Sequence, residues 1–414
     1  MTNDPLAHTE DKSVIRMTHR ERMLATIRGQ PTDQIPWAPR MDLWYIAQRA
    51  RGTLPAEFAG LDIVGIAEAL EVACRAVGGD FTVTGSHEIS LLGLDNHPDY
   101  PFRVELRALP IDCIDDGENV KTCIQTPAGE VFTHLYRDAQ MTQNGISLPF
   151  VKAYAINSVE DFEAVAQVFD HIEVIPTPEA YATFQQHVGH HGIAVAHGPR
   201  AASPMHLILH DLVAAEQFFY LYADSREALH RLAERIEPFF EAVLDALVAS
   251  DAEVVFWGGN YDQDITWPDF FEAEISSWLK NASERLHAAG KLMLTHADGE
   301  NRALLPFYPA CGFDVAESVC PQPMTRCTLS EIREGLGGKT TVWGGIPSVT
   351  LLEDSMTDRA FEAYLDDLLG SLGGGDHLIL GVSDNVPPDA DFTRLEQIKR
   401  RVKDFGSVQA TTQG

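Results

Sequence analysis

Basic residues are scarce in this chain of 414 residues, which has 31 lysines and arginines against 61 aspartates and glutamates. The formal net charge of −30 would repel nucleic acid and anionic membranes, so we expect neither as a partner. The sequence also lacks an apolar run of about 18 residues, so we expect no transmembrane helix. Its polar start has no apolar h-region, so we expect no signal peptide and a cytoplasmic protein.

Cysteine is also rare, and no two cysteines have the C-x-x-C spacing. The six cysteines are Cys74, Cys113, Cys123, Cys311, Cys320 and Cys327. Isolated cysteines in a long chain without secretory features are typical of buried thiols, so a disulfide framework is not expected.

Short apolar segments alternate with amphipathic helices along most of the chain. The expected strands are 35–39, 81–84, 193–196, 253–257, 292–295, 313–316, 341–343 and 378–380. The main expected helices are 18–30, 61–77, 158–169, 177–188, 203–249, 268–289, 328–336, 357–371 and 391–404. This alternation is typical of a (β/α)8 TIM barrel. An open dinucleotide-binding sheet is disfavoured, because no G-x-G-x-x-G follows a strand.

We therefore predict one barrel domain over residues 17–408, preceded by a disordered tail over residues 1–16. Residues 86–155 differ from the rest, because they alternate in the manner of β-strands and show no helical period. Within them, residues 119–137 have a Pro-Gly turn between two strand-like runs, which predicts a hairpin. We expect this β-rich insertion to lie outside the barrel, near its active mouth.

The segment KLMLTHADGEN places His296 at the end of the best-defined strand. Asp298 could cap a helix that begins near Glu300. Catalytic groups of parallel α/β proteins sit at the carboxyl ends of strands, so His296 is our first candidate for catalysis. The alternative is a histidine that only satisfies a loop carbonyl.

Other expected strands also end in polar residues that would meet at the same mouth. These residues are Arg40, Asp42, His197, Arg200, Asn260, Asp262, His296, Asp298, Glu317, Cys320, Ser383 and Asp384. We predict Asp262 and Asp384 to assist His296 in catalysis. His296, Glu317 and Cys320 are the donor types that Zn²⁺ accepts. Alternatively, Cys320 packs under its loop and Glu317 pairs with an arginine.

Arginines and aromatic residues near the mouth are candidates for substrate binding. The predicted substrate-binding set is Arg40, Trp44, His197, Arg200, Asn260, Tyr261 and Trp343. The arginines could bind a carboxylate or phosphate, or hold a strand-end aspartate in a salt bridge. The aromatic rings suit an aromatic or tetrapyrrole ligand, but would serve equally as core.

Five segments resemble the uroporphyrinogen decarboxylase superfamily. They are RERMLATIRGQPTDQIPWAPR, TPAGEVF, VKAYAINSVEDFEAV, THADG and GVSDNVPPDADFTRL. The resemblance covers roughly residues 17–405. It implies a (β/α)8 barrel and one of two activities: cofactor-free decarboxylation of a tetrapyrrole, or methyl transfer to or from a corrinoid, commonly with Zn²⁺.

The decarboxylase branch carries an Arg-Gln-Ala-Gly-Arg run after the first strand, of which PRMDLWYIAQRARG keeps only Arg40. The region around TPAGEVF is more similar to the corrinoid O-demethylase methyltransferases. Their zinc pattern, His-x-Cys with a later Cys, is reduced here to His296-Ala297-Asp298 and Val382-Ser383-Asp384.

The leading hypothesis from the resemblance is a methyltransferase that moves a methyl group from a small, methoxylated compound to a corrinoid such as cobalamin, either free or on a carrier protein. Zn²⁺ is a candidate metal. The alternatives are a uroporphyrinogen-type decarboxylase and a non-catalytic barrel that binds a corrinoid or tetrapyrrole. The sequence leaves the oligomeric state open, with a homodimer as one alternative.

Overall fold

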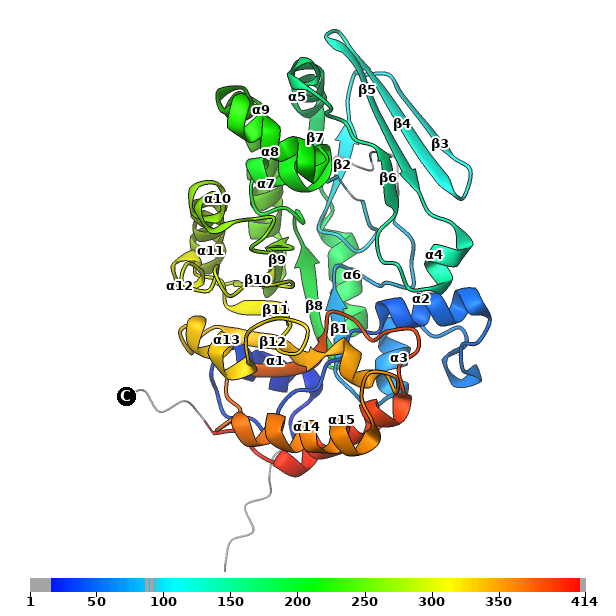
Figure 1. The fold of residues 1–414 in the computed structure, drawn as a ribbon, viewed down its shortest axis with the longest axis vertical. Coiled ribbons are helices and arrows are strands. Elements are labelled where there is room, and N and C mark those ends of the chain that lie inside the picture. Colours follow the sequence, from blue (N-terminus) through cyan, green and yellow to red (C-terminus); the bar gives the residue numbers. More distant parts are fainter. Residues whose placement is uncertain (1–15, 86–88, 90–92, 95, 410–414) are drawn as a thin grey trace, which may run out of the picture.

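A curled sheet of parallel strands is the centre of the computed structural model, which describes residues 16–85, 89, 93–94 and 96–409 (Figure 1). The sheet order is β1 (Cys74–Val77), β8 (Gly192–His197), β9 (Val254–Gly259), β10 (Leu292–His296), β11 (Val315–Val319), β12 (Thr341–Pro347) and β13 (Leu378–Ser383). The tail predicted over residues 1–16 lies, apart from Arg16, outside the described residues.

The segment predicted as the first strand lies between the two edges of this sheet. Trp37 forms a parallel bridge with Leu380 of β13, and the carbonyl of Trp37 accepts a 2.9 Å hydrogen bond from the N–H of Ala73. Pro36 and Pro39 have no N–H to donate, which limits this segment to an isolated bridge. The described chain therefore forms a curled seven-stranded sheet, without the continuous closed ladder that the sequence predicted.

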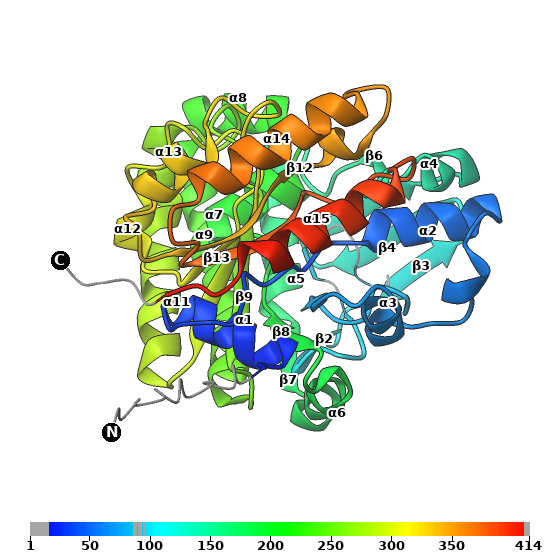
Figure 2. The ribbon, with the colours of Figure 1, turned by 90° about the horizontal axis from the view of Figure 1, so that it is seen from below.

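Helices cover the outside of the sheet, and α14 and α15 lie next to each other in the view from below (Figure 2). The helices are α1 (His19–Ile27), α2 (Asp42–Arg51), α3 (Ile63–Ala69), α4 (Ala139–Gln143), α5 (Phe162–Asp170), α6 (Pro178–Val188), α7 (Pro204–Leu207), α8 (Ala215–Asp224), α9 (Arg226–Ala249), α10 (Pro268–Phe270), α11 (Ser276–Ala288), α12 (Tyr308–Cys311), α13 (Leu329–Gly335), α14 (Asp358–Ser371) and α15 (Phe392–Phe405).

Two sequence predictions were wrong near the first strand of the sheet. The helix expected over residues 61–77 ends as α3 at Ala69, and Glu71 then takes a φ of 53° that no helix can continue. The rest of that segment is β1, and the expected strand 81–84 is a turn. Apolar residues fill both the short helix and the short buried strand after it, so the sequence pattern predicts a single helix across the two.

The helix expected over residues 203–249 is also interrupted. It divides into α7, a π-helical turn at Ile208–Leu212, α8 and the long α9. Single π-turns often occur at functional sites, and this one places His210 and Asp211 beyond the end of β8.

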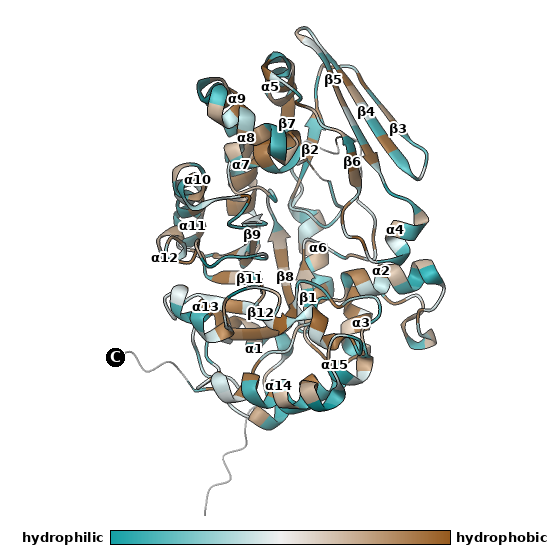
Figure 3. Cartoon of the chain, viewed as in Figure 1, coloured by the Kyte–Doolittle hydropathy of each residue, from teal (hydrophilic) through white to brown (hydrophobic). Residues whose placement is uncertain are grey.

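Alternate side chains of the parallel strands point into the curl and pack as one apolar cluster. This inner cluster includes Ile193, Val195, Phe256, Leu294, Val315, Trp343 and Ile379, and the strands are mostly hydrophobic (Figure 3). Met23, Leu24 and Ile27 of α1 join the cluster from the amino end. Because strand side chains alternate, the next inner positions beyond this cluster are Arg75, His197, His296 and Glu317.

A separate antiparallel sheet stands beside the carboxyl ends of the parallel strands (Figure 1). Its strands, which we call the cap, are β3 (Ile111–Asp115), β4 (Asn119–Thr126), β5 (Gly129–Tyr136) and β6 (Phe150–Ala153). The pairing of β4 with β5 confirms the hairpin predicted over residues 119–137. Helix α4, between β5 and β6, was not expected. The strands β2 (Phe102–Leu106) and β7 (Ile172–Pro176) pair with each other.

Among the described residues, no helix combines the length and the apolar character that crossing a bilayer would require.

Trp343 is expected to be a main contributor to the stability of the inner cluster, because it is only 1% exposed and its Nε1 donates to the carbonyl of Ala38 at 3.3 Å. Replacing it with alanine should lower the free energy of unfolding by about 3–5 kcal/mol, measured by chemical denaturation. As a control, Tyr220→Ala removes a ring that is 60% exposed and should change that energy by less than about 0.5 kcal/mol. Equal effects of the two variants would contradict this account of the core.

Candidate functional site

His296 and Glu317 are neighbours in the parallel register of β10 and β11. The Nδ1 atom of His296 lies 2.5 Å from Oε2 of Glu317. The other carboxylate oxygen of Glu317 accepts a 2.8 Å hydrogen bond from Nε of Arg75 and lies 2.7 Å from Nη2 of the same arginine in an ion pair. All three side chains are buried. They form a chain of alternating charge across β1, β11 and β10.

A second group of charged side chains lies next to the first. Arg40 donates to Asp42 at 2.9 Å and forms an ion pair with Asp384, which follows β13. Asp384 also accepts a 2.8 Å hydrogen bond from the hydroxyl of Ser318. Nη1 of Arg75 lies 3.6 Å from Asp42, which connects the two groups. We call the whole set the strand-end cluster: Arg40, Asp42, Arg75, His296, Asp298, Glu317, Ser318 and Asp384.

The cluster holds His296 in its protonated form. Burial alone would lower the pKa of the imidazole, but the carboxylates of Glu317 and Asp298 outweigh burial and raise that pKa well above its usual range. Burial would likewise raise the pKa of Glu317, but Arg75 and His296 hold it well below its usual range. Nε2 of His296 lies 3.7 Å from both Asp298 and Asp384. Nε2 of His296 therefore faces two further carboxylates, which favour the protonated ring.

The backbone around the cluster is strained at two non-glycine residues. Asn260, just after β9, has a φ of 60°, and Ser318, within β11, has a φ of 63°. Such residues cluster at functional sites. The amide N–H of Asn260 donates to the carbonyl of His296 at 3.0 Å. A Cβ at Gly259 would lie 2.7 Å from that of His296. The loop after β9 thus fixes the position of His296.

A cavity of about 790 Å³ lies between the cap and the ends of the parallel strands. It is lined by Gly85, Asn96, His97, Tyr100, Asp115, Gly117, Glu118, Val120, Leu135, Arg137, Ser147, Leu148, Pro149, Phe150, Val151, Tyr154, Arg200, His210 and Asp211. The side-chain amide nitrogen of Asn260 donates a 2.9 Å hydrogen bond to Nε2 of His210. Asn260 in turn contacts His296, so the cavity and the strand-end cluster are linked through one residue.

One predicted substrate-binding residue, Arg200, lines this cavity, and a second, His197, packs against Tyr100, which also lines it. Arg200 lies 3.8 Å from Asp211. The ring of His197 is stacked between Tyr100 and Phe256, with centroids 5.0 and 4.4 Å away. Burial, with a contribution from Arg200, lowers the pKa of His197 to about 3. His197 is therefore neutral and acts as a packing ring.

The structure places the predicted aromatic binding residues in the core. Tyr261 is fully buried and its hydroxyl bonds to Thr295 at 2.9 Å. Trp343 belongs to the inner cluster, and Trp44 packs on Phe58 and Phe392. None of the three lines the cavity. Their rings pack against other side chains in the core, which is the alternative role that we named for them from the sequence.

Asp262, predicted to be catalytic, links two loops through hydrogen bonds. Its carboxylate accepts from the N–H groups of Asp264 and Glu300, at 2.8 and 3.1 Å. The helix expected to begin near Glu300 does not form, and Asn301 instead donates to the carbonyls of the preceding turn. Asp262 therefore shapes the loop after His296.

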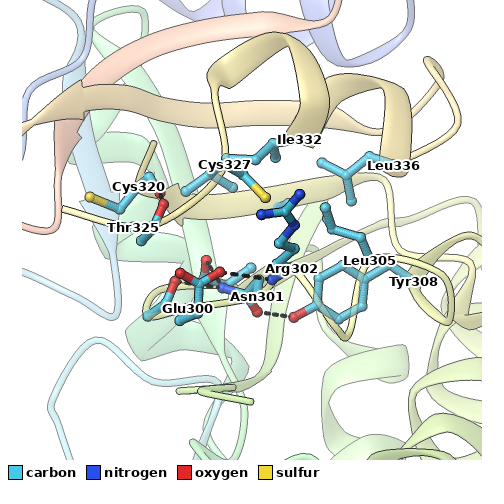
Figure 4. A pocket seen from close by; sticks show the side chains of 14 residues that line it. Glu300, Asn301, Arg302, Leu305, Tyr308, Cys320, Thr325, Cys327, Ile332 and Leu336 are labelled. Carbon is cyan, nitrogen blue, oxygen red and sulfur yellow. Dashed lines mark hydrogen bonds between the residues drawn. The ribbon is translucent and has the colours of Figure 1, made fainter. Parts of the chain in front are cut away.

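The predicted zinc ligands do not assemble as a donor set. Among the residues that the structure describes, no group of three or more His, Cys, Asp and Glu side chains is arranged to hold a metal ion. The thiol of Cys320 faces the carbonyls of Pro321 and Ser383, and burial raises its pKa to about 12. Cys320 also lines a cavity of only about 10 Å³ (Figure 4), room for a single water molecule.

Sequence reasoning missed Arg75, Ser318, His210 and Asp211. Arg75 lies in a segment for which the sequence pattern predicts a helix. The pair Gly78-Gly79, just after this segment, is the sequence feature that could have indicated the end of a strand. His210 and Asp211 lie in a π-helical turn, for which no sequence signal was apparent. Ser318 is an ordinary serine in sequence, and only its backbone conformation sets it apart.

Comparison with known proteins gives a family and several solved structures of similar fold. Residues 138–405 match the profile of the uroporphyrinogen decarboxylase (URO-D) family. A solved methyltransferase from Methanosarcina mazei superposes with a TM-score of 0.55 and 15% identity, over 94% of this chain and 99% of the other. At this identity the likeness concerns the fold. No curated protein sequence matches the chain.

Glu317→Gln should lower the pKa of His296 by about 1–3 pH units, because it removes the carboxylate that favours the imidazolium most. NMR titration of the imidazole signals would measure this change. Glu105→Gln, in an exposed pair with Arg103 and Arg107, is the control and should leave the His296 titration unaltered. An unchanged titration in Glu317→Gln would show that Glu317 does not set the charge of His296.

The pairing of His296 with Glu317 should also make the free energy of unfolding depend on pH. A raised pKa in the folded state stabilises the fold fully below the ordinary histidine pKa of about 6.5. That stabilisation should disappear as the pH rises through the elevated pKa of His296. The free energy of unfolding should therefore fall with pH in this window for the wild type, and fall less for Glu317→Gln.

Proposed function

Because this chain belongs to the uroporphyrinogen decarboxylase family, we propose that it is a methyltransferase that takes the methyl group of a small methoxylated compound and passes it to a corrinoid. The fold shared with a protein named as a methyltransferase supports this branch of the superfamily. The observation that carries the proposal is the contact of His296 with Glu317 at the carboxyl ends of the strands, where the neighbouring carboxylates raise the pKa of the imidazole.

Demethylation of an ether needs a proton for the departing oxygen, which is otherwise a poor leaving group. In the proposed step the bond between the methyl carbon and the oxygen breaks, and the oxygen takes the bonding electrons. His296 donates the proton on Nε2 to that oxygen, leaving an alcohol and a neutral imidazole that solvent reprotonates. A raised pKa suits a phenolic oxygen, because phenols have a pKa of about 10.

The surrounding side chains keep this acid ready. Arg75 holds Glu317 ionised, and Glu317 fixes the ring of His296 through Nδ1. This leaves Nε2 as the nitrogen that can face a substrate. Asp384 and Asp298, each 3.7 Å from Nε2, favour the imidazolium before transfer and would help a new proton to bind afterwards.

A bound corrinoid would supply the nucleophile that accepts the methyl group. The cavity beside the cluster, about 790 Å³, is within the range of small-molecule sites. Its apolar wall of Val120, Leu135 and Phe150 suits an aromatic ring or one face of a macrocycle. The corrinoid could be free or held by a carrier protein. Zn²⁺ fits less well, because Nδ1 of His296 is occupied by Glu317 and Cys320 faces carbonyl oxygens.

Uroporphyrinogen-type decarboxylation is supported less well by the geometry. In that hypothesis Arg40 would bind a carboxylate of the substrate. Arg40 is already paired with Asp42 and Asp384. Burial alone would lower the pKa of the Arg40 guanidinium, but the two carboxylates outweigh burial and raise that pKa above its usual range. Binding a substrate carboxylate there would require breaking an existing ion pair.

His296→Gln should lower the rate of methyl transfer by at least about 100-fold, since general acids typically contribute that much. The assay follows the conversion of cob(I)alamin to methylcobalamin by absorbance, with methoxylated aromatic compounds as donors. His287→Gln, which removes a surface histidine paired with Asp314 at 2.8 Å, is the matched control and should keep full activity.

Three results would count against the proposal. Loss of carboxylate from a tetrapyrrole, without methyl transfer, would favour the decarboxylase. Tight corrinoid binding without turnover of any donor would favour a binding protein. Full activity of His296→Gln would move the proton donor elsewhere, even if methyl transfer occurs.

A further inference from the structure

Arg137 is the cation of the cavity that has no carboxylate partner. It follows β5 in the cap, and its Nη2 donates to the carbonyls of Ile146, at 3.1 Å, and Ser147. Within the described part of the chain, no hydrogen bond reaches its Nε or Nη1, and no carboxylate lies within ion-pair distance. By contrast, Arg40 and Arg75 in the strand-end cluster are both paired.

An unpaired guanidinium that is partly removed from water is costly unless it gains a partner. Arg137 is half-buried and lines the cavity. Burial lowers its pKa, with no neighbouring charge opposing the effect. The free Nε–H and Nη1–H groups can donate charge-assisted hydrogen bonds to the oxygens of a carboxylate or phosphate.

Apolar side chains of the cap side line the same cavity as this cation. Leu148 and Phe150 also line the cavity and are 56% and 62% exposed, unusual for large apolar residues. The two carbonyls held by Arg137 belong to the segment just before them. A cation bordered by exposed apolar surface is suited to a ligand with an apolar body and an anionic group.

We propose that Arg137 binds the anionic group of the ligand in this cavity, while Leu148 and Phe150 contact its apolar body. This inference rests on the proposed function and specifies the donor as an anionic methoxylated aromatic compound. The same anionic chemistry could come from the phosphate in the nucleotide tail of a corrinoid. Both sources present oxygens to one guanidinium, and binding experiments separate them.

The experiment measures binding by isothermal titration calorimetry, without turnover, so it can succeed or fail independently of methyl transfer. One pair of probes is meta-methoxybenzoate and its neutral amide. The other is cobalamin, which carries the phosphate, and cobinamide, which lacks the nucleotide. The proteins are the wild type, Arg137→Gln, Arg137→Lys and the control Arg107→Gln. Arg107 is paired with Glu105 and Glu173 and does not line the cavity.

The wild type should bind the anionic member of one pair about ten- to a hundredfold more tightly than the neutral member, as expected for hydrogen bonds to a charged group. Arg137→Gln should abolish this preference, Arg137→Lys should keep part of it, and Arg107→Gln should keep all of it. A preference within the benzoate pair identifies the substrate as the source of the anion, and one within the corrinoid pair identifies the phosphate.

The proposal is overturned if the wild type shows no preference within either pair, or if Arg137→Gln retains it. Thermal unfolding of each variant guards against a simple loss of structure. Glutamine can still donate to one of the two loop carbonyls, so Arg137→Gln should unfold near the wild-type midpoint. If it unfolds much earlier, Arg137→Lys gives the decisive comparison, because an undiminished preference with lysine would contradict two-point recognition by a guanidinium.

Discussion

Charge compensation at the carboxyl ends of the parallel strands is the constraint on which the site depends. Strand side chains alternate, so the inner face that carries Val315 and Leu294 must continue with Glu317 and His296 one layer further on. These two groups are buried, and a buried charge without a partner costs several kcal/mol. Arg75 on β1 supplies the missing cation. The charge balance around His296 therefore depends on a strand that is distant from it in the sequence.

This dependence explains which parts of the site could be predicted from the sequence. One local rule, that functional groups stand at the carboxyl ends of buried strands, predicts four residues of the site. Each of these four follows or ends an apolar segment: His296, Glu317, Asp384 and Arg40. Arg75 also belongs to a buried strand, but the sequence pattern predicts a helix over that strand. The pairing of Glu317 with an arginine was foreseen as an alternative to zinc. Which arginine it would be depends on the sheet order, with β1 and β11 in place around the curl.

Other parts could not be predicted because sequence does not distinguish a core ring from a ligand-binding ring. Tyr261 and Trp343 follow or belong to strands at the expected places, yet both are turned into packed clusters. Asp262 has the type and position of a catalytic carboxylate, but N–H groups of the next loops already use its oxygens. Each outcome is decided by the partners that the fold brings within reach, and these partners lie far along the chain.

The cap and the curled sheet carry different chemical groups: the cap lines the cavity, and the sheet holds the strand-end cluster, which is linked to the cavity through Asn260 and His210. The sheet provides a compensated set of charges whose members restrain one another, so changing one of them disturbs the rest. The cap provides Arg137, for which the described residues offer no carboxylate partner, and the exposed Leu148 and Phe150, which line the same cavity. A substitution in the cap can therefore alter which ligand is preferred without altering the charge of His296. Under the proposed function, proton donation and ligand selection are separable, because the strand-end cluster and Arg137 belong to two sheets that form no common ladder.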